Sequence, residues 1–156
     1  MMSTRQDAGP PDPQFTITRW FMAPRRRVFQ AWSQSCELAC WLVPGSHSID
    51  FERYECRAAG FYRGRISAPD GSGYWVQGTV RTLLPPAGLV FTAARESSNG
   101  RVERKGARIV TLAEAGRQTQ LTLQIPLAVV LKTRGATARA WEHRFDRLAH
   151  HLETAA

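Results

Sequence analysis

The stretch RGATARAWEHRFDRLAHHLE, residues 134–153, decides the fold, because its apolar residues recur at helical spacing. Steps of three and four residues place them on one stripe of an α-helix. The stripe consists of Ala138, Trp141, Phe145, Leu148 and Leu152. Burying the large side chains of such a stripe is worth roughly 8 kcal/mol before entropy is counted. Because strands are the main upstream partner, the sequence predicts an α+β fold in which this helix closes a curved antiparallel sheet.

The chain before this helix is predicted to contain one strand, two short helices and then about six strands. Residues 14–21 alternate in the manner of a half-buried strand, with Ile17 and Phe21 toward the core. The first short helix begins near Pro24 and the second covers residues 33–41. Short turns between the later strands predict antiparallel pairing. Those strands are expected at residues 47–57, 60–68, 74–84, 89–95, 102–113 and 118–127.

The second predicted strand contains a break in its alternation. Ile49 and Phe51 share one parity, whereas Tyr54 and Cys56 share the other. A strand that keeps one face buried needs an extra residue to do this. We therefore expect a β-bulge near residues 52–53.

The length and composition are typical of one globular domain, which we place at residues 14–153. Residues 1–13 are rich in Pro and poor in apolar side chains, so a disordered tail is expected there. The sequence contains neither a membrane-length apolar run nor a secretory signal, and a cytoplasmic location is expected. A shorter apolar run at residues 127–131 is expected to end a strand or to lie at a pocket rim.

The net charge of +8 comes from 21 basic and 13 acidic side chains, and it leaves several partners open. The arginines are spread along the chain, so an ordinary basic surface is favoured over nucleic-acid binding. The run at residues 25–27 is interpreted as a solvated helix face, with a phosphate-binding patch as the alternative. Arg63, Arg65 and Arg81 are expected on the outer face of the sheet, which leaves an acidic protein partner open. A homodimer is left open as well.

The cysteines and histidines do not predict a metal site or a cofactor. Cys36, Cys40 and Cys56 are interpreted as buried thiols, because nothing completes the three or four ligands that a metal needs. His47 is expected at a strand start beside the mouth of the predicted pocket. The histidines of the last helix are expected to be solvated: His143, His150 and His151.

A series of short motifs resembles an AHSA-like domain, in the family named for the activator of the heat-shock-protein ATPase. The motifs are FTITR at 15–19, APR at 23–25, VFQAW at 28–32, LACW at 38–41, GFYR at 60–63, PDG at 69–71, GTV at 78–80, PP at 85–86, LVFT at 89–92 and TQLTL at 119–123, with Trp141 and Leu148. Their order and spacing cover roughly residues 14–153. The sequence departs from the family where Trp41-Leu42 and Ala59-Gly60 stand, since two aromatics and two glycines are frequent there.

The resemblance places the chain in the START-like (SRPBCC) helix-grip superfamily. It implies a sheet that grips the long helix, with a cavity between them. Ligands of the superfamily are typically lipids, sterols, polyketides and other hydrophobic molecules. Some members are aromatases or cyclases, and others are co-chaperone domains.

The candidate site is the space between the sheet and the last helix. Gly64 and Gly78 are expected to face the helix and to leave room for a ligand. The hydroxyls of Tyr62 and Tyr74 would supply polar groups in an apolar pocket. The expected lining is Trp41, Tyr62, Val76, Phe91, Trp141 and Phe145. The alternative is that these residues fill a solid core.

The sequence favours binding of a small hydrophobic molecule (a lipid, a polyketide or an aromatic compound) over catalysis. It has no nucleophile elbow, phosphate loop, zinc-protease motif or dinucleotide fingerprint, so no catalytic residue is assigned. A polyketide cyclase or aromatase is the first alternative, with Tyr62 or Tyr74 and Glu52 as its acid–base pair. A co-chaperone-like interaction domain is the second, and a large exposed apolar patch would mark it.

Overall fold

The computed structural model describes residues 13–96 and 102–154, so nearly all of the predicted N-terminal tail lies outside the described residues. The strands are β1 (Gln14–Phe21), β2 (Ser48–Tyr54), β3 (Gly60–Ser67), β4 (Gly73–Leu84), β5 (Gly88–Glu96), β6 (Val102–Ala115) and β7 (Gln118–Pro126). The helices are α2 (Arg25–Ser33), α3 (Ser35–Trp41), α4 (Leu127–Val130) and α5 (Arg134–Thr154). Of these helices, none is long and apolar enough to cross a membrane.

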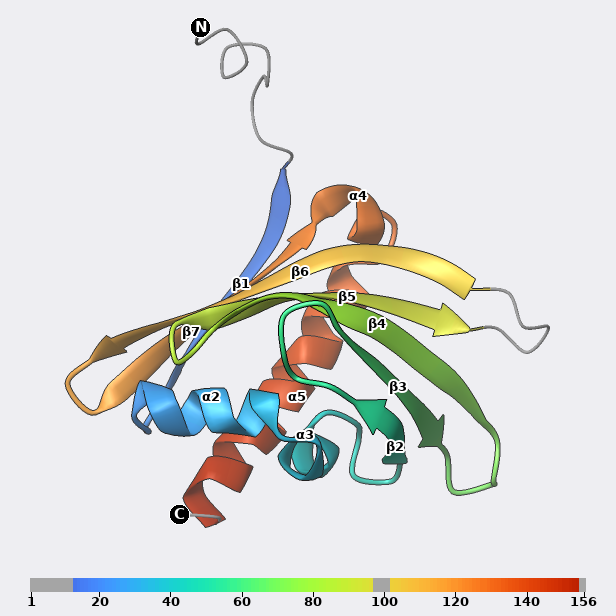
Figure 1. Ribbon diagram of the computed structural model, residues 1–156, viewed down its shortest axis with the longest axis horizontal. Helices are drawn as coiled ribbons and strands as arrows, with labels where there is room; N and C mark the ends of the chain where they lie inside the picture. The colour runs from blue at the N-terminus through green and yellow to red at the C-terminus, as the bar shows by residue number, and fades with distance from the viewer. Residues whose placement is uncertain (1–12, 97–101, 155–156) are drawn as a thin grey trace, which may run out of the picture.

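The strands form one antiparallel sheet of seven strands, in the order β1-β7-β6-β5-β4-β3-β2. The first strand therefore pairs with the last, and Ile17 lies opposite Leu123. Figure 1 shows the sheet curving over α5, with α2 and α3 on the same side. This arrangement confirms the predicted α+β helix-grip fold and the two short helices after the first strand.

The predicted stripe of α5 faces the sheet. Trp141, Phe145, Leu148 and Leu152 are all buried, and Phe145 meets Phe21 of β1 edge to face at 5.9 Å between ring centroids. On β7, buried positions alternate with half-buried ones, as a strand with one covered face requires. The inward residues of β7 are Leu121, Leu123 and Ile125.

The predicted β-bulge is present in β2. The register with β3 shifts between Phe51 and Arg53, so that Phe51 lies opposite Gly64 and Tyr54 lies opposite Tyr62. The extra residue lets both Phe51 and Tyr54 point toward the helices.

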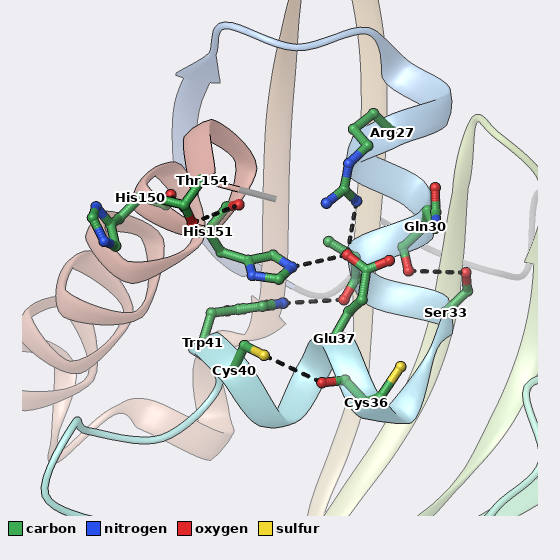
Figure 2. Close-up of polar contacts among 11 residues, drawn as sticks. Arg27, Gln30, Ser33, Cys36, Glu37, Cys40, Trp41, His150, His151 and Thr154 are labelled. Atoms are coloured by element: carbon green, nitrogen blue, oxygen red, sulfur yellow. Dashed lines mark hydrogen bonds and ion pairs between the residues drawn. The ribbon is translucent and has the colours of Figure 1, made fainter. Parts of the chain in front are cut away.

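A part-buried polar cluster joins the three helices α2, α3 and α5 (Figure 2). Arg27 of α2 donates to the Glu37 carboxylate of α3 at 2.7 Å, and Nε2 of His151 on α5 lies 2.8 Å from the same oxygen. The Trp41 indole donates to the Ala31 carbonyl at 3.1 Å. The His151 side chain is only 12% exposed, so the prediction that it is solvated is wrong. The carboxylate on the facing helix could not be seen from the sequence of α5 alone.

Two other local predictions are wrong. The run at residues 127–131 forms the short helix α4 instead of a strand end, because the chain turns after Pro126. Cys36 and Cys40 are exposed, since α3 buries the opposite side, which carries Leu38 and Trp41. Cys56, between β2 and β3, is half-buried.

Candidate functional site

A cavity of about 350 Å³ lies between the inner face of the sheet and the helices. Its walls come from strands β2 to β6, from α2 and α3, from the segment that joins α3 to β2, and from α5. Its volume is in the range of small-molecule pockets, about 300–1,000 Å³. The apolar lining residues are Trp32, Leu38, Leu42, Val43, Pro44, Ile49, Phe51, Ile66, Val76, Val80, Leu89, Phe91, Ala93 and Trp141.

Four of the six residues predicted to line the site do so: Tyr62, Val76, Phe91 and Trp141. Trp41 and Phe145 do not line it, because both are fully buried in the neighbouring core. Trp41 packs edge to face against Trp32 at 4.8 Å, and Phe145 lies between Phe21 and Trp141. These two side chains therefore support the cavity wall from behind.

The two glycines do not create the cavity in the way that the sequence suggested. A Cβ at Gly64 would meet the side chains of Phe51 and Ile49 at 3.1–3.3 Å, so the neighbouring strand already fills that space. A Cβ at Gly78 would overlap the Thr92 carbonyl and lie 2.7 Å from the Tyr62 hydroxyl. Gly78 thus makes room for a hydrogen bond of the protein and not for a ligand.

Two tyrosine hydroxyls of the lining are already occupied as donors. Tyr54 donates to the Trp32 carbonyl at 2.7 Å, and Tyr62 donates to the Thr92 carbonyl at 2.6 Å. Burial raises the pKa of both phenols, and Cys56 adds to the increase at Tyr54. Both phenols therefore stay protonated near neutral pH, and neither can act as a base.

Two arginines, Arg108 of β6 and Arg144 of α5, bring positive charge to the cavity lining. Arg144 donates through Nε to the Leu42 carbonyl at 2.9 Å, and its guanidinium lies 4.6 Å from the centroid of the Trp141 ring. Arg108 donates to the Gly106 carbonyl at 3.1 Å. Burial lowers the pKa of both guanidiniums, but the pKa of arginine is so high that both remain charged.

Further polar residues lie along the lining. His47 lines the cavity, and its Nδ1 lies 2.9 Å from the Ser46 hydroxyl. Tyr74 also lines it, and the guanidinium of the exposed Arg95 stacks on the Tyr74 ring at 3.8 Å. His47 is thus placed at the pocket, as the sequence predicted.

The acid–base pair predicted for an enzyme is not assembled. Glu52 points to the outer face of the sheet, where its carboxylate accepts from Arg63 at 3.1 Å and its side chain is 59% exposed. The bulge sends Phe51 and Tyr54 inward, and this turns Glu52 away from Tyr62. Among the side chains that the structure describes, those of residues 13–96 and 106–154, no carboxylate lines the cavity, and no group of three or more His, Cys, Asp or Glu gathers to hold a metal.

The sequence contained signals for the two arginines, although they were missed. Arg108 has the same strand parity as Val110 and Leu112, which are buried on the inner face. Arg144 stands three residues after Trp141, so it lies at the edge of the apolar stripe of α5. In both cases the charge suggested a solvated position, while the periodicity indicated a position at the covered face.

Comparisons with known proteins agree with this architecture. The model of the family described as "Activator of Hsp90 ATPase homolog 1-like protein" matches residues 22–153. No curated protein is significantly similar in sequence. Many solved structures share the fold. The AHSA1 protein from Silicibacter pomeroyi superposes with a TM-score of 0.79 at 17% identity, over 92% of this chain and 100% of that chain.

Two further structures extend the comparison. A protein from Arthrobacter aurescens has a TM-score of 0.79 at 19% identity, over 90% of this chain and 86% of that chain. A protein from Chromobacterium violaceum has a TM-score of 0.73 at 22% identity, over 90% and 96% of the two chains. At these identities the structures establish the fold alone, whereas the family match covers most of the sequence. The chain therefore belongs to the family of activator of Hsp90 ATPase homolog 1-like proteins.

Proposed function

We propose that the protein binds a small hydrophobic molecule in the cavity between the sheet and α5. The observation that carries this proposal is the 350 Å³ space itself, which is lined mainly by aliphatic and aromatic side chains. Interiors of proteins are normally close-packed, so a space of this size beside a well-packed core favours a ligand. The lining also offers few polar groups, which is typical of pockets for apolar compounds.

The other functions considered for the sequence have less support. Trp20 and Met22 are exposed close together at the end of β1, whereas the other large exposed apolar side chains of the described residues, Leu84 and Leu131, come from separate elements. So small a set does not favour a co-chaperone-like contact surface. On the outer sheet face, Arg63 is occupied by Glu52 and Glu96, which weakens the case for an acidic protein partner.

Binding can be tested with the neutral apolar dye N-phenyl-1-naphthylamine and a panel of hydrophobic compounds. We expect dye fluorescence to rise on binding. A ligand at a hundredfold excess over its Kd should raise the Tm by about 5–10 °C, because it stabilises only the folded state. If no compound of the panel raises the Tm and the dye fluorescence does not increase, the proposal is wrong.

A matched pair of variants locates the binding. Ala93 lines the cavity, whereas Ala94 is the next residue of β5 and pairs with Gln77, away from the cavity lining. Ala93→Phe should fill the space and abolish dye binding. Ala94→Phe should leave the affinity within about twofold of wild type, because successive residues of a strand face opposite sides of the sheet. Equal dye binding by both variants would place the ligand elsewhere.

A further inference from the structure

We propose that the ligand is an amphipathic anion, with an apolar body in the cavity and one carboxylate on the guanidinium of Arg144. This inference rests on the proposed binding function and deepens it by naming the ligand class. It follows from which hydrogen-bond donors the cavity still offers, and from how Arg144 is held.

Two neutral donors of the lining are committed, whereas the buried indole N–H of Trp32 has no hydrogen-bond partner among the described residues. The hydroxyls of Tyr54 and Tyr62 donate to backbone carbonyls at 2.7 and 2.6 Å, so a ligand meets only their oxygen lone pairs. Arginine has five N–H donors, and Arg144 gives the one on Nε to Leu42. The two terminal nitrogens of Arg144 are left for a ligand, and a guanidinium fork matches the two oxygens of a carboxylate.

Arg144 is positioned before any ligand arrives. The Leu42 carbonyl holds its Nε, and the Trp141 ring lies under its guanidinium at 4.6 Å from the centroid. Trp141 and Leu42 both line the cavity, so the same contacts that fix the charge also shape the apolar wall. A preorganised group loses little freedom on binding, which favours affinity.

Among the described side chains, those of residues 13–96 and 106–154, no carboxylate forms an ion pair with Arg144. The carboxylates that form ion pairs there are engaged with other cations, and none lines the cavity. Arg108 also lines the cavity, so a second guanidinium borders the same space. The described lining therefore has basic side chains and no acidic one, which favours an anion over a cation.

The test compares two ligands of nearly equal shape, 2-naphthylacetic acid and its neutral primary amide, by isothermal titration calorimetry. Wild-type protein should bind the acid at least about tenfold more tightly than the amide, because only the acid forms a charge-assisted pair. Arg144→Met should remove this preference, so that the ratio of acid affinity to amide affinity falls to about one. Arg147→Met is the matched control, since Arg147 also donates from α5 to a carbonyl of α3, that of Cys40, but does not line the cavity.

Each outcome bears on the inference separately from the proposed function. If wild type binds the amide as tightly as the acid, the anion preference is wrong and hydrophobic binding stands. If the neutral dye binds but neither naphthyl compound does, the inference is again overturned alone. If the dye and both naphthyl compounds fail to bind, the binding function and this inference fall together. If Arg147→Met loses the preference for the acid as Arg144→Met does, the role assigned to Arg144 is wrong. The ratio of acid affinity to amide affinity in the wild-type protein tests the inference even if Arg144→Met folds poorly.

Discussion

The interior of the molecule has two halves that differ in packing although they share one sheet. The packed half comprises β1, β6 and β7 with α2 and the second half of α5, and its core includes Phe145, Leu148 and Leu121, each fully buried. The cavity half comprises β2 to β5 with α3 and the middle of α5, and Trp32 of α2 and Arg108 of β6 complete its wall. Some of its inner residues are only half-buried: Tyr62, Val76 and Phe91. The difference indicates that one half supplies the stability that lets the other half stay open.

The largest expected effect is on the packed half. Phe145→Ala should lower the free energy of unfolding by about 3–5 kcal/mol, because it opens a cavity in a close-packed core. Phe91→Ala should cost clearly less, about 1–2 kcal/mol, since Phe91 already borders open space. Urea denaturation measures the loss of unfolding free energy in each variant. Equal losses would show that the two halves do not differ in packing.

The opposite change, adding volume, should give the second largest effect. Ala31 is fully buried in the packed half, and Ala31→Phe should destabilise the protein by about 3 kcal/mol through overpacking. Ala93→Phe should change the stability by less than about 1 kcal/mol, because the cavity accepts the ring. Thermal unfolding of both variants without ligand measures these changes in stability. A strongly destabilised Ala93→Phe variant would mean that the space is narrower than the structure indicates.

The smallest expected effect concerns the polar cluster that joins the two halves. Burial opposes the ionisation of Glu37, but its hydrogen bonds with His151 and Arg27 outweigh burial and lower the pKa of the carboxyl. Its contribution is therefore complete above the ordinary carboxyl pKa of about 4.3, and it is lost as the pH falls through the lower pKa of the folded state. Glu37→Gln should cost about 1.5 kcal/mol at pH 7.

The measurement is the stability of wild type and of Glu37→Gln between pH 3 and pH 7. The difference between the two should shrink as the pH falls below about 4.3. A difference that stays constant over this range would contradict the proposed role of the carboxylate. Glu142→Gln is the matched control, because Glu142 is an exposed glutamate of α5, and this variant should behave like wild type throughout.

Periodicity was sufficient to predict the fold, because each element has one covered face. The spacing of Trp141, Phe145 and Leu148 and the alternation of β7 depend only on local geometry and on burial. The break between Phe51 and Tyr54 even predicted the bulge, since a buried face cannot change parity without an extra residue.

The site was harder to predict, because a cavity depends on what fails to fill the space. Trp41 and Phe145 have the same periodicity as the lining residues, yet neighbours from other elements enclose them completely. The room beside Gly64 is taken by side chains of the adjacent strand, and the room beside Gly78 is taken by the Thr92 carbonyl and the Tyr62 hydroxyl. Whether an inward residue borders a cavity or a core is a property of the assembled structure, and the pattern along one strand does not contain it.

The bulge in β2 has a consequence for how such a protein can diverge. One surplus residue in an edge strand decides that Tyr54 forms part of the wall while Glu52 faces solvent. Removing Glu52 would leave Phe51, Arg53 and Tyr54 opposite Gly64, Arg63 and Tyr62 in regular alternation, so the inward residues would stay the same and the core around Phe145 would not be touched. A single-codon deletion at this place would therefore straighten the edge strand while the pocket wall and the fold stay as they are.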